Sequence, residues 1–177
     1  MDRKSVVGLG VMHDDGIYKM WYAGKDDKEQ AIGYAESKDG VLWEKHKNNP
    51  VMRPRGHDKW DSGDFVGAPY ILKKDGVYQM WYASLSYSDD KSVRETGYAV
   101  SKDGIHWDRY EKNPVLRRGK SGEWDSKESA RNFVMLDEGF YKMWYKGSDG
   151  IVDAIGYATS KDGINWGKYK NNPVLAP

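Results

Sequence analysis

The sequence of 177 residues contains no cysteine. Disulfide frameworks, thiolate zinc sites and cysteine nucleophiles are therefore excluded. The sequence also lacks an apolar run of membrane-spanning length, and residues 1–7 lack the apolar segment of a secretory signal peptide. Together these absences favour a reducing compartment, so we expect a cytoplasmic protein with no membrane partner.

An excess of charge of either sign is missing too, since 28 Lys and Arg stand against 27 Asp and Glu. The two signs are interspersed, which predicts a solvated surface of mixed charge and no nucleic-acid partner. The histidines show no metal-ligand spacing. The segment Gly8-Leu9-Gly10 lacks the third glycine and the helix of a dinucleotide-binding loop. We therefore expect no metal and no cofactor.

Aromatic residues are abundant, with 8 Trp and 13 Tyr. The octapeptide Gly-Val-Tyr-Gln-Met-Trp-Tyr-Ala at 76–83 recurs with small changes at 16–23 and 139–146. Three further motifs recur in the same order: Gly-Tyr-Ala from Gly33, Gly97 and Gly156, Ser-Lys-Asp-Gly from Ser37, Ser101 and Ser160, and Asn-Pro-Val from Asn49, Asn113 and Asn172. A tryptophan follows each Ser-Lys-Asp-Gly, and Trp-Asp-Ser occurs at Trp60 and Trp124. The period of about 60 residues predicts three copies of one structural unit.

Each unit is predicted to form four short strands. In the middle unit we expect strands at 65–72, 77–83 and 96–101 and a fourth from Trp107, with turns at 74–76 and 102–104 and a polar loop at 85–94. The alternation within the second strand places Tyr78, Met80 and Tyr82 on one face and Trp81 on the other. Large side chains on both faces indicate a strand that is covered on both sides. No segment has a sustained helical period, so we expect no long helix.

Four-stranded repeats of this length predict an all-β propeller array with antiparallel blades at about 1–60, 61–124 and 125–177. The alternatives are a repeated β-sandwich, which would not repeat so faithfully, and a β-solenoid, whose period is usually shorter. Propellers usually have four to eight blades, so three would leave two aromatic faces open. We expect a second copy to cover these faces in a six-bladed homodimer; the alternative is a piece of a larger propeller.

Residues that break the repeat at the start of the first strands are the candidates for a site, because innermost strands line the channel of a propeller. Alignment on the hairpin turns, with one deletion before Gly139, places Asp64 opposite Glu128. It also places 67–69 opposite 131–133. Two carboxylates flanking a pocket suit glycoside hydrolysis, one as acid and one as base or nucleophile. We therefore predict Asp64 and Glu128 as catalytic residues.

Side chains suited to holding a sugar lie around these carboxylates. Tryptophan faces stack on sugar rings and arginine donates to carboxylates or hydroxyls. The predicted substrate-binding residues are Arg131, Asn132, Trp60, Asp61, Trp124 and Asp125. The alternative is that the two aspartates of the Trp-Asp pairs cap loops and that Asp64 and Glu128 are solvated strand ends.

Two parts of the sequence resemble known propellers. The Ser-x-Asp-Gly-x-x-Trp turn resembles the Asp-box of sialidase-type propellers, which is a structural turn. The whole middle unit resembles a blade of the five-bladed glycosidase propellers, namely glycoside hydrolase families 32, 43 and 68 and the related mannoside phosphorylases. The segments that carry this resemblance are 60–63, 66–69, 78–83, 96–107 and 113–116.

That family is similar in using three inner-strand carboxylates, one of them often in an Asp-Pro pair. Here the pair is Ala68-Pro69, and only Glu128 stands where the acid is expected, with Asp64 as a partner. The resemblance therefore implies a glycosidase-like propeller that binds carbohydrate in its channel and has possible residual glycoside hydrolase activity. The alternative is a non-catalytic structural, engineered or fragmentary propeller that assembles as a homo-oligomer.

Overall fold

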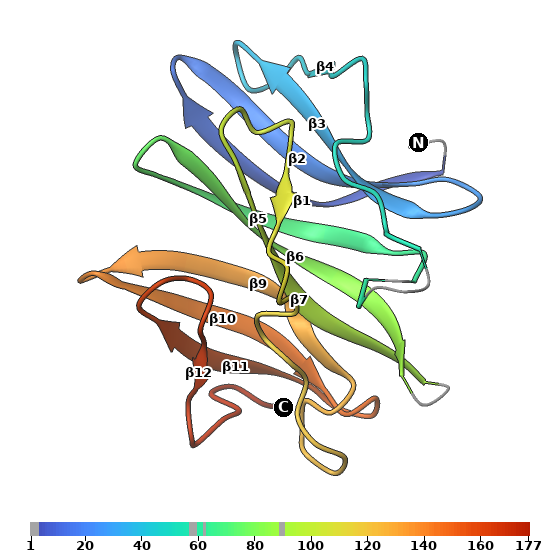
Figure 1. The fold of residues 1–177 in the computed structure, drawn as a ribbon, viewed down its shortest axis with the longest axis vertical. Coiled ribbons are helices and arrows are strands. Elements are labelled where there is room, and N and C mark those ends of the chain that lie inside the picture. The colour runs from blue at the N-terminus through green and yellow to red at the C-terminus, as the bar shows by residue number, and fades with distance from the viewer. Residues whose placement is uncertain (1–3, 57–59, 62, 89–90) are drawn as a thin grey trace.

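The computed structural model describes residues 4–56, 60–61, 63–88 and 91–177. Within these ranges the chain forms twelve strands and no helix (Figure 1). Since these residues contain no helix, none of them belongs to a helix able to cross a bilayer.

Three four-stranded antiparallel sheets follow one another along the chain, and we call them blades 1, 2 and 3. Blade 1 comprises β1 (Ser5–Asp14), β2 (Ile17–Lys25), β3 (Gln30–Ser37) and β4 (Glu44–Lys45). Blade 2 comprises β5 (Val66–Lys74), β6 (Val77–Ser88), β7 (Lys91–Ser101) and β8 (Asp108–Arg109). Blade 3 comprises β9 (Glu128–Asp137), β10 (Phe140–Ser148), β11 (Asp153–Ser160) and β12 (Gly167–Lys168).

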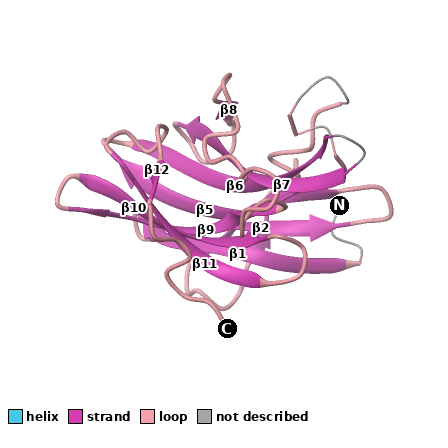
Figure 2. Cartoon of the chain, turned by 90° about the horizontal axis from the view of Figure 1, so that it is seen from below, coloured by secondary structure: helices cyan, strands magenta, loops and turns pink. Residues whose placement is uncertain are grey.

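The blades lie face to face, with blade 1 at the top of Figure 1 and blade 3 at the bottom, and Figure 2 shows the layers from below. Among the first strands, β1 neighbours β5 and β5 neighbours β9. A short parallel pairing of Arg94 with Glu128 and of Glu95 with Ser129 joins blade 2 to blade 3. The prediction of an all-β array of propeller blades is therefore confirmed, in the form of a partial propeller.

One predicted element was wrong. The polar loop expected at 85–94 instead extends β6 and β7, and Leu85 pairs with Arg94 and Ser86 with Val93. Leu85 and Val93 are buried although the segment is polar on average. Their alternation with polar residues is the strand period, which the overall polarity of the segment concealed. The fourth strands are shorter than expected, with two residues each.

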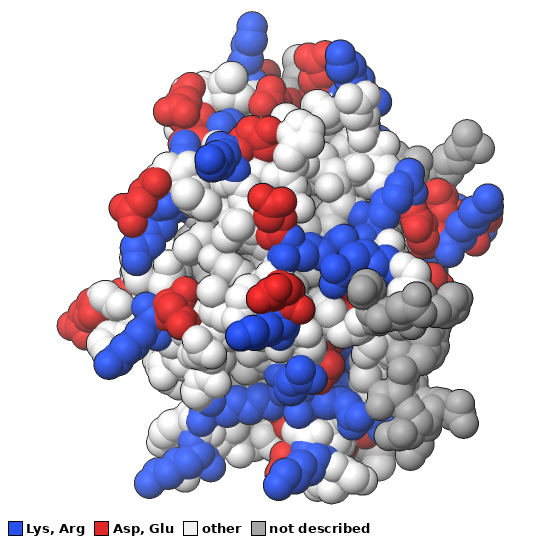
Figure 3. Space-filling view, viewed as in Figure 1, with Lys and Arg blue, Asp and Glu red and all other residues white. Residues whose placement is uncertain are grey.

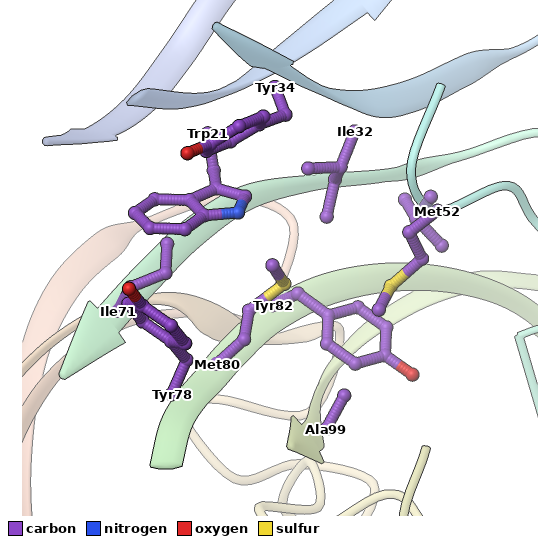
Figure 4. Packing of buried hydrophobic residues seen from close by; sticks show 10 residues of the cluster. Trp21, Ile32, Tyr34, Met52, Ile71, Tyr78, Met80, Tyr82 and Ala99 are labelled. Atoms are coloured by element: carbon purple, nitrogen blue, oxygen red, sulfur yellow. The ribbon is translucent and has the colours of Figure 1, made fainter. Parts of the chain in front are cut away.

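The core consists of two aromatic layers between blades. Between blades 1 and 2, Trp21 packs with Tyr34 of its own blade and Tyr78 of the next, at ring-centroid distances of 5.2 and 5.7 Å (Figure 4). Between blades 2 and 3, Trp81 packs in the same way with Tyr98 and Tyr141, at 5.4 and 5.7 Å. Strand β6 thus contributes large side chains to both layers, which confirms that it is covered on both faces.

The three Ser-x-Asp-Gly-x-x-Trp turns are structural. In blade 2 the Asp103 carboxylate accepts hydrogen bonds of 2.8 Å from the backbone N–H groups of Ile105 and His106. Asp39 and Asp162 make the equivalent backbone bonds in the other blades. Burial alone would raise the pKa of Asp103, but these bonds and the His106 side chain outweigh it and hold the pKa below its usual range.

The Asn-Pro-Val motif also has a structural role. The side chains of Asn49, Asn113 and Asn172 accept a 2.8 Å bond from the N–H, and donate to the C=O, of a tyrosine in the third strand of their blade. The amide therefore satisfies the strand backbone just beyond the short fourth strand, as a neighbouring strand would.

Candidate functional site

The inner strands share a bulge that fixes how the blades are compared. Gly8, Ala68 and Arg131 all have positive φ, at 54°, 46° and 57°, and each begins the register shift of its strand. Each lies the same distance before the end of its strand. The alignment with a deletion before Gly139 was therefore wrong by one residue. The octapeptides at 76–83 and 139–146 have the same spacing as Ala68 and Arg131, so no deletion is needed.

With the bulges superposed, Glu128 corresponds to Phe65 and Ser5, whereas Asp64 corresponds to Lys127 and Lys4. We call the interface between two neighbouring blades a seam. Asp64 lies before β5 at the seam between blades 1 and 2, where its C=O accepts a 2.8 Å hydrogen bond from the Gln30 N–H. Its side chain is exposed. Glu128 begins β9 at the seam between blades 2 and 3. The two predicted catalytic carboxylates therefore lie at different seams of the propeller.

Glu128 is buried and surrounded by cations. Its Oε1 accepts a 3.0 Å bond from Nε of Arg131, and its Oε2 accepts a 3.1 Å bond from Nζ of Lys146. One guanidinium nitrogen of Arg94 lies 3.9 Å from Oε2, and the Arg94 guanidinium also covers the Phe65 ring, 5.4 Å from its centroid. We call Glu128, Arg131, Lys146 and Arg94 the Glu128 cluster.

The Glu128 cluster carries more positive than negative charge. Lys146 also contacts the Asp153 carboxylate at 3.0 Å, so three cations face two carboxylates. This ion pair and a hydrogen bond from Ser148 hold the pKa of Asp153 below its usual value, the hydrogen bond having the larger effect. Arg131 keeps half of its side chain, 51%, in solvent. A solvent molecule or ligand can therefore reach a cation of the cluster without opening the seam.

Sequence reasoning missed two members of the cluster. Lys146 occupies the position of Ala23 and Ala83 in the octapeptide, so it breaks the repeat as clearly as Arg131 does. Applying the same test to the second strand would have found it. Arg94 was hidden because its segment was predicted to be a loop.

The two Trp-Asp pairs lie within the body of their blades. Asp61 is fully buried; its Oδ1 accepts a 2.8 Å bond from Arg55 and its Oδ2 lies 3.3 Å from Nε of Arg109 on β8. Asp125 accepts bonds from Tyr145, at 3.2 Å, and from Lys168 of β12, at 2.5 Å. Both carboxylates thus tie the entry of a blade to its outermost strand, which supports the loop-capping alternative.

The tryptophans of these pairs pack on glycines. An added Cβ at Gly97 would come within 2.6 Å of the Trp60 ring, and one at Gly156 within 2.7 Å of the Trp124 ring. Trp60 also packs with Tyr82, and Trp124 with Tyr145, at centroid distances of 5.9 and 5.7 Å. These contacts explain why a glycine stands at Gly97 and Gly156, since a side chain there would clash with the tryptophan ring.

Asn132 follows Arg131 but its side chain lies in the seam. Its Oδ1 accepts a 3.0 Å bond from the Thr96 hydroxyl of β7, and the residue is buried. Arg131 and Asn132 therefore face different surroundings although they are adjacent. Among the described residues, no group of three His, Asp or Glu side chains is arranged to hold a metal ion.

On the face drawn in Figure 3, charge alone does not single out another site. On the face in Figure 3, acidic and basic side chains are interspersed over blades 1 and 2, and a band of Lys and Arg crosses the lower part, where blade 3 lies. The cluster around Glu128 is distinguished by burial and by its position at the start of an inner strand.

Comparison with known proteins relates the chain to carbohydrate-active enzymes, although no family model matches it. An uncharacterized protein of Mycobacterium tuberculosis is 30% identical over 141 residues, which cover 78% of this chain and 44% of that protein. A 1,2-beta-oligomannan phosphorylase of a Thermoanaerobacter species is 26% identical over 187 residues, which cover 99% of this chain and 55% of that enzyme. The chain spans about half the length of the curated relatives it matches.

Solved structures give the same result for the fold. A family 117 glycoside hydrolase of Zobellia galactanivorans superposes with a TM-score of 0.84 at 20% identity, covering 97% of this chain and 57% of that one. Structures of families 43 and 130 also match. The chain has the five-bladed β-propeller fold of glycoside hydrolase families 43, 117 and 130, and it carries three blades of it. The resemblance seen in the sequence to family 43 and the mannoside phosphorylases is confirmed.

Proposed function

We propose that the protein binds carbohydrate at the Glu128 cluster, on the channel side of the seam between blades 2 and 3. The observation that carries the proposal is the break in the repeat. Glu128 stands where blades 2 and 1 have Phe and Ser. Arg131 stands where they have Ala and Gly, and Lys146 stands where both have Ala. Three charges replace neutral residues at one place, and they contact one another.

The chemistry of the cluster suits a sugar. The carboxylate accepts hydrogen bonds from hydroxyl groups, while guanidinium and ammonium groups donate to hydroxyl or anionic oxygens. The surplus of positive charge favours a sugar that bears, or is accompanied by, an anionic group. The phosphorylase relative acts on 1,2-beta-oligomannan by its name, so β-1,2-linked mannooligosaccharides with inorganic phosphate are the first ligands to test.

The proposal is binding rather than hydrolysis. Hydrolysis of a glycosidic bond uses two carboxylates that flank it, one of which donates a proton. Glu128 is ion-paired on both oxygens, and Asp64 lies at the other seam. We therefore expect no turnover of aryl glycosides by the wild-type protein. Turnover that is lost in Glu128→Gln would instead support the hydrolase function.

Isothermal titration with β-1,2-mannotriose, with and without phosphate, tests the proposal. Arg131→Ala and Lys146→Ala install the residues that blade 2 carries at these positions, so the backbone tolerates them. A hydrogen bond to a charged group contributes about 1.5–3 kcal/mol, so each variant should lose affinity roughly tenfold to a hundredfold. Lys102→Ala removes an exposed charge in a distant turn and should bind normally. Equal affinity in all four proteins, or no binding by any of them, would contradict the proposal.

A further inference from the structure

The two seams between blades are built from the same contacts. At the first seam, Nε1 of Trp21 donates to the Gly104 carbonyl of the next blade at 2.6 Å, and its ring meets Trp107 edge-on at 6.2 Å. At the second, Nε1 of Trp81 donates to the Gly163 carbonyl at 2.8 Å, and its ring meets Trp166 at 6.3 Å. Each blade thus presents a tryptophan to the Ser-Lys-Asp-Gly turn of the blade that follows.

A second bond crosses each seam at the hairpin end of the blades. At the first seam, Nζ of Lys19 donates to the Tyr78 hydroxyl at 2.6 Å. At the second, the Tyr141 hydroxyl donates to Oε1 of Gln79 at 2.9 Å. In both seams, the third residue of the second strand, Lys19 or Gln79, is therefore hydrogen-bonded to the octapeptide tyrosine of the next blade. These paired bonds define what a complete seam requires.

The outer face of blade 3 carries the tryptophan that, in the two seams, donates a hydrogen bond to the following blade. We call such a face the donating half of a seam. Trp144 corresponds to Trp21 and Trp81, but it is only partly buried, and no described residue accepts a hydrogen bond from its Nε1. Phe133, which corresponds to Tyr70 of the second seam, is 52% exposed. Apolar side chains that the seams elsewhere cover are open on this face.

The outer face of blade 1 carries the turn that, in the two seams, accepts the hydrogen bond of that tryptophan. We call such a face the accepting half of a seam. Val134 is fully buried at the second seam, but its counterpart Val11 on β1 is 46% exposed. Val41, the counterpart of the partly buried Ile105 and Ile164, is 76% exposed. A hollow of about 500 Å³ lies beside this turn and is lined in part by Leu42 and Trp43. Blade 1 thus lacks the tryptophan that blades 2 and 3 each receive.

We propose that these two end faces are the halves of a third seam, and that a second copy of this chain supplies each missing half. In this arrangement Nε1 of Trp144 donates to the Gly40 carbonyl of the other copy, and Lys142 meets its Tyr18 hydroxyl. Both halves belong to one chain, so two copies bring together two complementary pairs of faces. A head-to-tail contact of this kind forms a ring when its rotation closes.

The product is a ring of six blades, one more than the solved structures with this fold have. Closure therefore requires a slightly smaller rotation between blades than in those proteins. Besides side-chain packing, the seams contain a few backbone contacts, such as the short pairing of β7 with β9 and the bond from the Gln30 N–H to the Asp64 carbonyl, so these contacts must also accommodate the smaller rotation. The two Glu128 clusters then lie in one channel.

Light scattering after size exclusion tests the proposal on the whole chain. A closed pair has a mass of 2 × 20.3 = 40.6 kDa, and one chain has 20.3 kDa. Val41→Lys adds a charge at an exposed position, so it leaves each chain folded while it blocks the third seam. Ile151→Lys makes the same kind of change at a position that is 91% exposed in the β10–β11 loop, outside the end faces.

We expect the wild type and Ile151→Lys to elute as 40.6 kDa species at micromolar concentration, and Val41→Lys as a folded 20.3 kDa species. A folded wild-type monomer at that concentration would overturn the proposal. So would a dimer that persists in Val41→Lys and in Trp144→Lys, because its interface would lie elsewhere. Open polymers in place of a closed pair would also refute it.

Discussion

Replacing Trp81 with alanine should remove a large part of the stability of the fold. The side chain is fully buried between blades 2 and 3, and its Nε1 donates to the Gly163 carbonyl at 2.8 Å. Burial of a large apolar side chain contributes about 1.5–3 kcal/mol. The cavity that alanine leaves and the carbonyl that loses its donor raise the expected loss to about 3–5 kcal/mol.

Equilibrium unfolding in urea, followed by far-ultraviolet circular dichroism, measures this loss as a change in unfolding free energy. Tyr169→Ala is the control, because Tyr169 is an aromatic residue that stays 45% exposed outside the seams, and it should cost less than about 1 kcal/mol. A loss below about 1 kcal/mol for Trp81→Ala would refute the account of how the blades are held together, since Trp81 would then contribute no more than an exposed aromatic residue.

Three further predictions concern the blades. Gly97→Ala should lose about 1–3 kcal/mol of unfolding free energy, because its Cβ would meet two rings at 2.6 Å; Gly56→Ala meets nothing within 4 Å and should unfold like the wild type. Asp61→Ala strands two arginines and should cost about 1–3 kcal/mol in urea unfolding without changing sugar affinity in titration; unchanged stability with lost affinity would contradict its structural role. Asp162 has a folded-state pKa below its usual range, because hydrogen bonds outweigh burial. Its stabilisation is therefore complete above an unfolded-state pKa of about 3.9 and is lost as the pH falls below it. Asp162→Asn should flatten the decline of unfolding free energy on acidification, and an unchanged decline would refute this.

The blades were predictable from the sequence because each rests on a periodic pattern. The repeat of Met-Trp-Tyr gave the second strand, and its alternation placed Trp81 and Met80 on opposite faces, each of which is buried in the structure. The Asp39, Asp103 and Asp162 turns were recognisable because the carboxylate bonds to backbone groups two and three residues on, which is a local interaction.

The site was only partly predictable, because it depends on the exact alignment of the first strands and on contacts between blades. The positive-φ residues Ala68 and Arg131 align β5 with β9 without a deletion, and this alignment separates Asp64 from Glu128. Arg94 meets Glu128 through a parallel pairing of two strands from different blades, which no local pattern encodes. Lys146 was visible in the sequence as a break in the repeat, because it replaces the last alanine of the octapeptide. The search for such breaks covered only the first strands.

A crystal structure of the protein with β-1,2-mannotriose and phosphate bound tests the central claim most directly. The account predicts density for the ligand at the start of β9, with oxygen atoms within hydrogen-bond distance of Arg131 and Lys146. Ligand density that lies elsewhere, for example over the exposed turn of blade 1, with the Glu128 cluster left unchanged, would contradict it.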